Sequence, residues 1–168
     1  IGGQPVRFEP HRCFACGELN EHGLRLILHT DSIGCRTEVT LDSRFQGWEG
    51  VAHGGILCTI LDEVMAWAVI GRDTWGVTAR MTVDFRRPVP IGRALRAEGE
   101  VTEATRRLYQ TAGRIIDAET GEVLAMSHGT YVAAPPERLS ELKARYRLRP
   151  VDDRSAADRG DVPEPVDS

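Results

Sequence analysis

Apolar and polar residues alternate without a break from Val77 to Arg86, which is the clearest pattern in the chain. Val, Ala, Met, Val and Phe share one face, while Thr, Arg, Thr, Asp and Arg share the other. This period of two predicts a half-buried antiparallel strand. The strand is expected to end in residues 87–92, since the two prolines there cannot donate to a central sheet ladder.

Shorter alternating segments predict further strands on both sides of this one. They cover Leu24–His29, Cys35–Leu41, Leu95–Thr105, Leu108–Ile116 and Val123–Ala133. Turn-forming residues at 31–34 separate the first two segments, and residues 117–121 separate the last two. Both placements indicate antiparallel hairpins.

The segment Gly54–Ile70 instead predicts one long helix. At 100° per residue, its large apolar side chains fill a continuous half of the circumference. Asp62 lies just outside this half, whereas Glu63 projects to another side and is interpreted as solvated or ion-paired. With so little polar surface, the helix is expected to be covered on most sides. A hairpin before it and four strands after it indicate an α+β fold, in which a single antiparallel sheet curls around the helix.

The chain divides around this sheet-and-helix domain, which is assigned to residues 24–134. Residues 1–23 are rich in Gly, Pro and polar residues and are expected to form an irregular N-terminal arm. Residues 135–148 begin with two prolines and contain a predicted short C-terminal helix. Residues 149–168 are charged, with few large apolar side chains, and are expected to be disordered.

Composition and charge exclude several classes of protein. The 168 residues fit one domain that can bury a substantial core. A net charge of −4 gives no electrostatic case for a nucleic-acid partner. No apolar run approaches the ~18 residues of a membrane span, and no signal peptide is recognisable. The four cysteines lack the pattern of a secreted disulfide framework, so a cytoplasmic location is expected.

The segment 13–17, Cys-Phe-Ala-Cys-Gly, has the spacing of half a zinc site. No second pair of ligands follows at a usual interval, although His11 and His22 are close enough in sequence to complete a set of four. The favoured interpretation is a knuckle turn that ends at Gly17 with two partly buried thiols, and no metal ligand is assigned. A redox role is disfavoured because no βαβ pattern surrounds the pair.

The start of the predicted helix combines two features that acyl transfer requires. His53-Gly54-Gly55 opens the helix, and the first N–H groups of a helix lack internal partners, so they can stabilise an oxyanion. Asp62 supplies a carboxylate in apolar surroundings. Gly54 and Asp62 stand about 12 Å apart along the helix axis, too far to touch one reacting carbonyl. If both act, a second helix must lie antiparallel to the first, as in an isologous homodimer.

The same segments carry a resemblance to a known family. Residues 45–55, Phe-Gln-Gly-Trp-Glu-Gly-Val-Ala-His-Gly-Gly, form a specific signature, and Asp62 follows at the expected offset. Residues 78–80 and the Arg-Pro-Val-Pro at 87–90 strengthen it. Over residues 13–134 the chain resembles the hotdog-fold acyl-CoA thioesterases. The branch it resembles most is the phenylacetate-pathway type, which includes relatives of 4-hydroxybenzoyl-CoA thioesterase.

The resemblance implies a hotdog fold and assigns roles to several residues. Asp62 is implied to be the catalytic carboxylate, and the Gly54 N–H, acting from the partner subunit, to polarise the thioester carbonyl. His53 is implied to form the turn and hold the thioester region, with Gly55 beside it in the substrate-binding set. Thr78 matches a strand hydroxyl that positions the attacking water. The alternative is a structural role, with His53 as a cap and Thr78 as a strand former.

The resemblance also implies where the rest of the substrate binds. Arg86 and Arg87 are candidates for the coenzyme A phosphates, and the alternative is that they are solvated strand-end charges. Many relatives carry an asparagine six residues before the histidine, where this chain has Gly47. The side-chain amide of Gln46 is the candidate substitute. Coenzyme A is part of the substrate, so no separate cofactor is expected.

These residues predict an acyl-CoA thioesterase that releases free acid and coenzyme A from a small or medium acyl-CoA, aryl groups included. Asp62 would act as a general base toward water or as a nucleophile, and the sequence leaves both open. The alternatives are an acyl-thioester hydratase or dehydratase on the same fold, and a non-catalytic acyl-CoA-binding protein. A homodimer is expected, with dimers pairing into a tetramer, and neither nucleic acid nor membrane is an expected partner.

Overall fold

The computed structural model describes residues 3–151, which form one antiparallel sheet with its accompanying helices. The strands are β1 (Pro5–Phe8), β2 (Leu28–Thr30), β3 (Gly34–Thr40), β4 (Gly76–Phe85), β5 (Ala94–Ala104), β6 (Leu108–Asp117), β7 (Val123–Ala133) and β8 (Leu148–Pro150). The helices are the short 3₁₀ helix η1 (Ser43–Phe45), α1 (Gly54–Ile70) and α2 (Pro136–Arg145). The strands lie in the order β4-β7-β6-β5-β3-β2-β1-β8, and every neighbouring pair is antiparallel.

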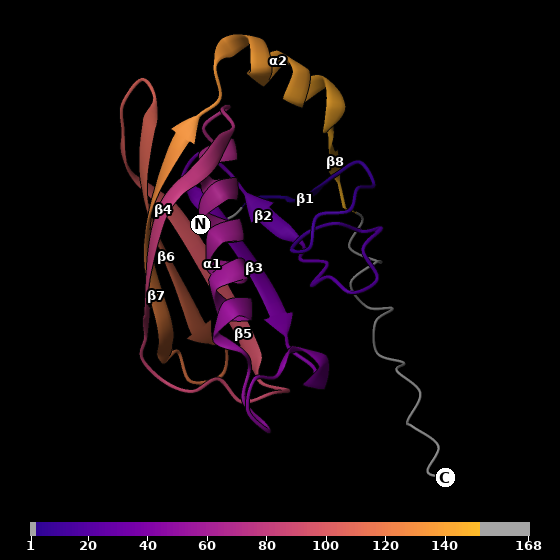
Figure 1. The fold of residues 1–168 in the computed structure, drawn as a ribbon, viewed down its shortest axis with the longest axis vertical. Helices are drawn as coiled ribbons and strands as arrows, with labels where there is room; N and C mark the ends of the chain where they lie inside the picture. Colours follow the sequence, from indigo (N-terminus) through magenta and orange to yellow (C-terminus); the bar gives the residue numbers. More distant parts are fainter. Residues whose placement is uncertain (1–2, 152–168) are drawn as a thin grey trace.

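Helix α1 lies along one face of the sheet, which wraps around it (Figure 1). Its buried side chains occupy the centre of the core; they are Leu57, Ile60, Leu61, Val64, Met65, Trp67, Ala68 and Val69. Helix and sheet approach closely at Gly99 of β5, where an added Cβ would lie 2.6 Å from the backbone of Val64. The predictions of one long helix and of a single sheet curled around it are confirmed.

The predicted strands from β3 to β7 begin and end within one residue of the observed ones. The prediction that β4 is half-buried is wrong for the single chain, because Val77 is 71% exposed and Phe85 is 54% exposed. Two features explain the difference. Within residues 3–151, β4 is an edge strand that pairs only with β7, and a bulge between Thr78 and Arg80 interrupts the simple alternation.

The N-terminal arm is less irregular than predicted. Strand β1 pairs with β2 on one side and with β8 on the other. The ring of Phe8 at the end of β1 lies 4.5 Å from the Trp67 ring and 4.9 Å from the Trp75 ring, centroid to centroid. Strands of three or four residues are too short to show a period in sequence, and burial of Phe8 against α1 explains why this one forms.

Strand β2 is shorter and begins later than the predicted Leu24–His29. The preceding N–H groups bond elsewhere, with Leu24 donating to the Phe14 carbonyl and Leu26 to the Ala15 carbonyl, both at 2.9 Å. Residues 24–26 therefore hydrogen-bond to the turn of the N-terminal arm and do not continue strand β2.

The C-terminal region also differs from its predicted division. Helix α2 ends at Arg145, and β8 follows it. This strand spans the predicted boundary between the helical segment, residues 135–148, and the tail, residues 149–168. The tail predicted to be disordered lies outside the described residues from position 152 onward. Among the described helices, none has the length and hydrophobicity needed to cross a bilayer.

Candidate active site

The N-terminus of α1 is organised by a side-chain cap. His53 is the N-cap residue, and its Nδ1 accepts a hydrogen bond of 2.9 Å from the Gly55 N–H. An added Cβ at Gly55 would lie only 3.0 Å from Nδ1, so a glycine suits this position. The Gly54 N–H has no acceptor among the described residues. The cap thus leaves one donor at the helix start for a ligand.

Asp62, in the middle of α1, accepts two hydrogen bonds on one carboxylate oxygen. Its Oδ1 lies 2.7 Å from Oγ1 of Thr78 on β4 and 2.8 Å from the hydroxyl of Tyr131 on β7. Thr78 and Tyr131 stand directly opposite each other in the β4–β7 ladder, which explains why both reach the same atom. No side chain among the described residues donates to Oδ2, which leaves that oxygen available to a water molecule or a substrate.

Tyr131 is a site residue that sequence reasoning missed. Its side chain is fully buried, and its hydroxyl also contacts the Asp62 backbone carbonyl at 3.0 Å. Burial, followed by the neighbouring Asp62 charge, raises the pKa of Tyr131 above its ordinary value, so the hydroxyl keeps its proton and donates. The sequence does contain a pattern that could have identified Tyr131. Alternation along β7 places it on the same buried face as Ala125 and Ser127, and a buried tyrosine hydroxyl usually needs a hydrogen-bond partner.

Replacing Tyr131 with phenylalanine is expected to lower the free energy of unfolding by about 1–3 kcal/mol, because the mutation removes a buried hydrogen bond to a carboxylate. Urea unfolding of both proteins at neutral pH measures the difference. Tyr109→Phe is the matched control, since Tyr109 faces Tyr131 across β6 and β7 and its hydroxyl has no partner in residues 3–151. Equal stability of the two variants would contradict the proposed importance of the Tyr131 hydroxyl.

One chain does not bring Asp62 and the helix start together. Strand β4 runs alongside α1, so that Thr78 contacts Asp62, whereas Phe85 packs at the helix start. The Phe85 ring lies 3.3 Å from the position of a Cβ added to Gly54. Gly54 and Asp62 are separated by about 12 Å of helix, as the sequence predicts.

Gln46 has a local role in the loop before α1. Its Oε1 accepts a hydrogen bond of 3.2 Å from the Gly50 N–H, which closes the loop between η1 and the helix. The side chain is exposed, and its amide nitrogen is the atom that could donate a hydrogen bond to a ligand.

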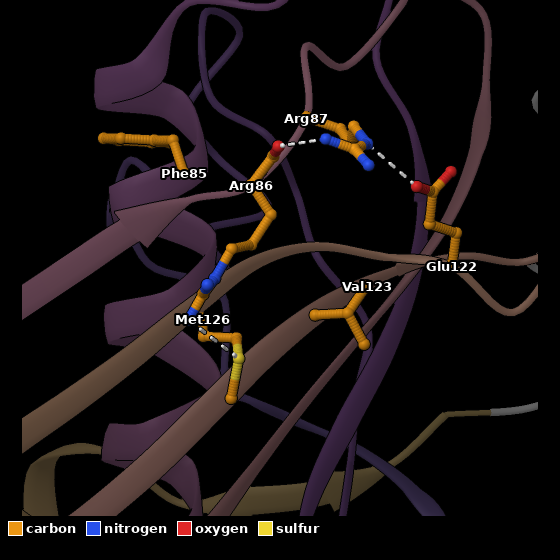
Figure 2. A pocket seen from close by; sticks show the side chains of 6 residues that line it. All are labelled: Phe85, Arg86, Arg87, Glu122, Val123 and Met126. Atoms are coloured by element: carbon orange, nitrogen blue, oxygen red, sulfur yellow. Dashed lines mark hydrogen bonds and ion pairs between the residues drawn. The ribbon is translucent and has the colours of Figure 1, made fainter.

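Arg86 and Arg87 border an open pocket at the end of β4. Its other lining residues are Phe85, Glu122, Val123 and Met126 (Figure 2). Nε of Arg87 lies 3.0 Å from the Glu122 carboxylate, so its charge is already paired. The Arg86 side chain extends instead toward Met126, with a guanidinium nitrogen 4.0 Å from the sulfur (Figure 2). Of these two candidates for phosphate binding, Arg86 has the guanidinium without a carboxylate partner among residues 3–151.

The prediction that Glu63 is solvated or ion-paired is wrong. Its Oε1 accepts a hydrogen bond of 2.8 Å from the Trp67 indole, and its carboxylate lies near the Cys16 thiol. Burial raises the pKa of Glu63 to about 7, and the nearby Cys13 and Asp62 add to the shift. A helical projection gives the side on which Glu63 lies but not the arm that packs there.

The family model described as thioesterase superfamily matches residues 49–124. The matched part of the chain is similar to that superfamily. It includes the whole of α1 with Asp62, together with β4 and Thr78. None of the curated proteins is a significant match to the sequence.

Solved structures support the same fold. A crystallised thioesterase superfamily protein is 30% identical, with a TM-score of 0.68 over 72% of this chain, and the chain covers 60% of that protein's length. The Escherichia coli PaaI protein of the phenylacetic acid degradation operon is 21% identical, with a TM-score of 0.61 over 65% of this chain and 83% of its own. A hypothetical thioesterase from Streptococcus pneumoniae, solved with coenzyme A, is 20% identical, with a TM-score of 0.60 over 62% of this chain and 81% of its own. The hotdog fold inferred from the sequence resemblance is confirmed.

Proposed function

We propose that this protein is an acyl-CoA thioesterase that hydrolyses its substrate to free acid and coenzyme A. The observation that carries the proposal is the Asp62 carboxylate, held on one oxygen by Thr78 and Tyr131 and open on the other. It lies on the central helix of a thioesterase superfamily domain. Binding of coenzyme A by a protein of the same fold supports the substrate class.

In the proposed mechanism, Asp62 either removes a proton from a water that attacks the thioester carbonyl or attacks that carbonyl itself. The hydroxyls of Thr78 and Tyr131 fix its orientation. The Gly54 N–H of a partner subunit polarises the carbonyl oxygen and stabilises the oxyanion. Collapse of the tetrahedral intermediate expels the coenzyme A thiolate, which takes up a proton. When water attacks, this step gives the free acid directly; when Asp62 attacks, it gives a mixed anhydride, which water then hydrolyses to the free acid and the restored carboxylate.

This mechanism requires a homodimer, and β4 supports one. It is a ten-residue edge strand whose outer side has no strand partner in residues 3–151. Val77 and Phe85 expose apolar surface along it. A two-fold partner lying antiparallel here would cover both and bring its own helix start toward Asp62. We expect the dimers to pair further into tetramers, and light scattering that finds only a monomer contradicts the mechanism.

Arg86 is proposed to bind a coenzyme A phosphate. Arg86→Gln is expected to raise KM for acyl-CoA about 3–10-fold, because it removes a charge-assisted contact with a phosphate at an exposed position. An acyl thioester of N-acetylcysteamine has no phosphate, so its KM is expected to change little. Arg106→Gln, in the turn between β5 and β6, is the charge-matched control. Equal changes for both substrates would remove Arg86 from the phosphate site.

The function is tested by thiol release over a panel of acyl-CoAs that varies in chain length and includes aryl groups. Turnover with release of one thiol per acid formed supports the proposal. Loss of the enoyl-CoA chromophore without free thiol would indicate a hydratase instead. Tight acyl-CoA binding without turnover across the panel would indicate a binding protein. The four free thiols agree with the reducing, cytoplasmic location that we propose for the reaction.

A further inference from the structure

The turn that carries Cys13 and Cys16 is tightly built. The Gly17 N–H donates to the Cys13 carbonyl at 2.9 Å, and a Cβ added at Gly17 would lie 2.4 Å from that oxygen. The knuckle turn expected from the sequence is therefore present. It presents both sulfur atoms on the same side, toward His11.

Three potential metal ligands meet at this turn. The ligand atoms of His11, Cys13 and Cys16 all lie within 4.8 Å of one another, and the His11 Nε2 is 3.4 Å from the Cys16 Sγ. Zinc binds sulfur at about 2.3 Å and nitrogen at about 2.0 Å, which places tetrahedral ligand atoms about 3.5–3.8 Å apart. The three side chains need only a small contraction to reach that geometry. His22, the other histidine near the turn, is exposed and lies outside the cluster.

The orientation of His11 matches that of a metal ligand. Its Nδ1 lies 3.1 Å from the Glu9 carbonyl, which holds the ring and leaves Nε2 directed at the sulfur atoms. Histidine ligands of metals usually donate their other ring N–H in this way, because the bond fixes the tautomer and the ring. The Phe8 ring packs edge-on against the imidazole, with centroids 5.6 Å apart.

The central helix places a carboxylate beside this cluster. The Glu63 carboxylate lies near the Cys16 thiol but outside the cluster of three ligand atoms, and its Oε1 accepts the 2.8 Å hydrogen bond from the Trp67 indole. Carboxylate oxygen is an established zinc donor beside sulfur and nitrogen. Glu63 makes no salt bridge within residues 3–151, so its charge is not otherwise neutralised there.

We propose that His11, Cys13 and Cys16 bind a zinc ion and that the Glu63 carboxylate turns toward it as the fourth ligand. Four protein ligands leave no open position, so the site is structural and not catalytic. It fastens the N-terminal arm to α1 at the residue next to Asp62, and thereby supports the helix turn that carries the carboxylate. The proposal is independent of the thioesterase activity, since it concerns a site on another side of the helix.

Zinc content of the full chain tests the site. The reduced protein is loaded with Zn²⁺, passed over a desalting column and measured by elemental analysis, with an expected content of about one zinc per chain. Loading with Co²⁺ is expected to give the sulfur-to-metal charge-transfer absorption of thiolate ligands. A wild-type protein that retains no zinc, or in which Cys13 and Cys16 form a disulfide that reductant does not open, overturns the proposal.

Matched variants identify the ligands. Cys13→Ser, Cys16→Ser and His11→Gln are expected to lose the zinc, while Cys58→Ser and His22→Gln retain it. Glu63→Gln is expected to weaken zinc affinity at least ~10-fold in a chelator competition, and unchanged affinity would remove Glu63 from the set. Circular dichroism checks folding, and the Co²⁺ spectrum of the wild type decides the question if the cysteine variants do not fold. Loss of zinc from the two control variants as well would contradict the assignment.

Discussion

Asp62→Asn is expected to lower kcat for acyl-CoA hydrolysis by at least ~100-fold and to leave the fold intact. An asparagine oxygen can still accept hydrogen bonds from Thr78 and Tyr131, so the side chain keeps its position. The amide can neither take a proton from water nor attack a thioester. Steady-state thiol release with the best substrate of the panel measures the loss.

Asp73→Asn is the matched control for this variant. Asp73 is exposed and pairs with Lys143 at the surface, and its φ of 59° is one that asparagine also adopts. We expect its kcat to stay within about twofold of wild type, since a surface ion pair contributes little. If Asp62→Asn turns over as fast as this control, Asp62 is not the catalytic carboxylate.

Gly54→Pro is expected to lower kcat about 100–1000-fold relative to Gly54→Ala, the effect of losing one oxyanion donor. Proline suits the first position of a helix, so the substitution removes the N–H without breaking α1. The preceding His53, with φ of −67° and ψ of 132°, already has a conformation that a following proline allows. Thiol release by the two variants, compared at saturating substrate, measures the difference.

Gly54→Ala controls for the added atoms. Both side chains place a Cβ 3.3 Å from the Phe85 ring, but alanine keeps the N–H. If the two variants lose the same activity, contact with Phe85 and not a missing hydrogen bond is responsible. If neither loses activity, the oxyanion is stabilised elsewhere.

Long elements could be predicted from the sequence because their periods repeat many times. The helix over Gly54–Ile70 was predicted with its observed bounds, and β7 likewise. The pairing of β1 with β8 could not be predicted, since each is a few residues long and the two lie far apart in sequence. Their stability comes from packing around Phe8 and from the sheet edge, which a local pattern does not contain.

The site could be predicted only in part, for a related reason. The position of Asp62 on the helix and its distance from Gly54 follow from helical geometry alone. The partnership of Asp62 with Tyr131 joins residues 69 positions apart, and it depends on the register between β4 and β7. The environment of Glu63 depends in the same way on where the arm carrying Cys16 folds.

The pairing of Thr78 opposite Tyr131 makes strand alignment itself a determinant of reactivity. Because side chains in a strand point alternately to its two faces, a slip of one residue would turn the threonine hydroxyl away from the carboxylate while leaving the sheet hydrogen-bonded. The irregularity just after Thr78 opposes such a slip by giving this stretch one favoured alignment. Changes of loop length between α1 and β4 would therefore be tolerated only when the alignment of these two strands survives them.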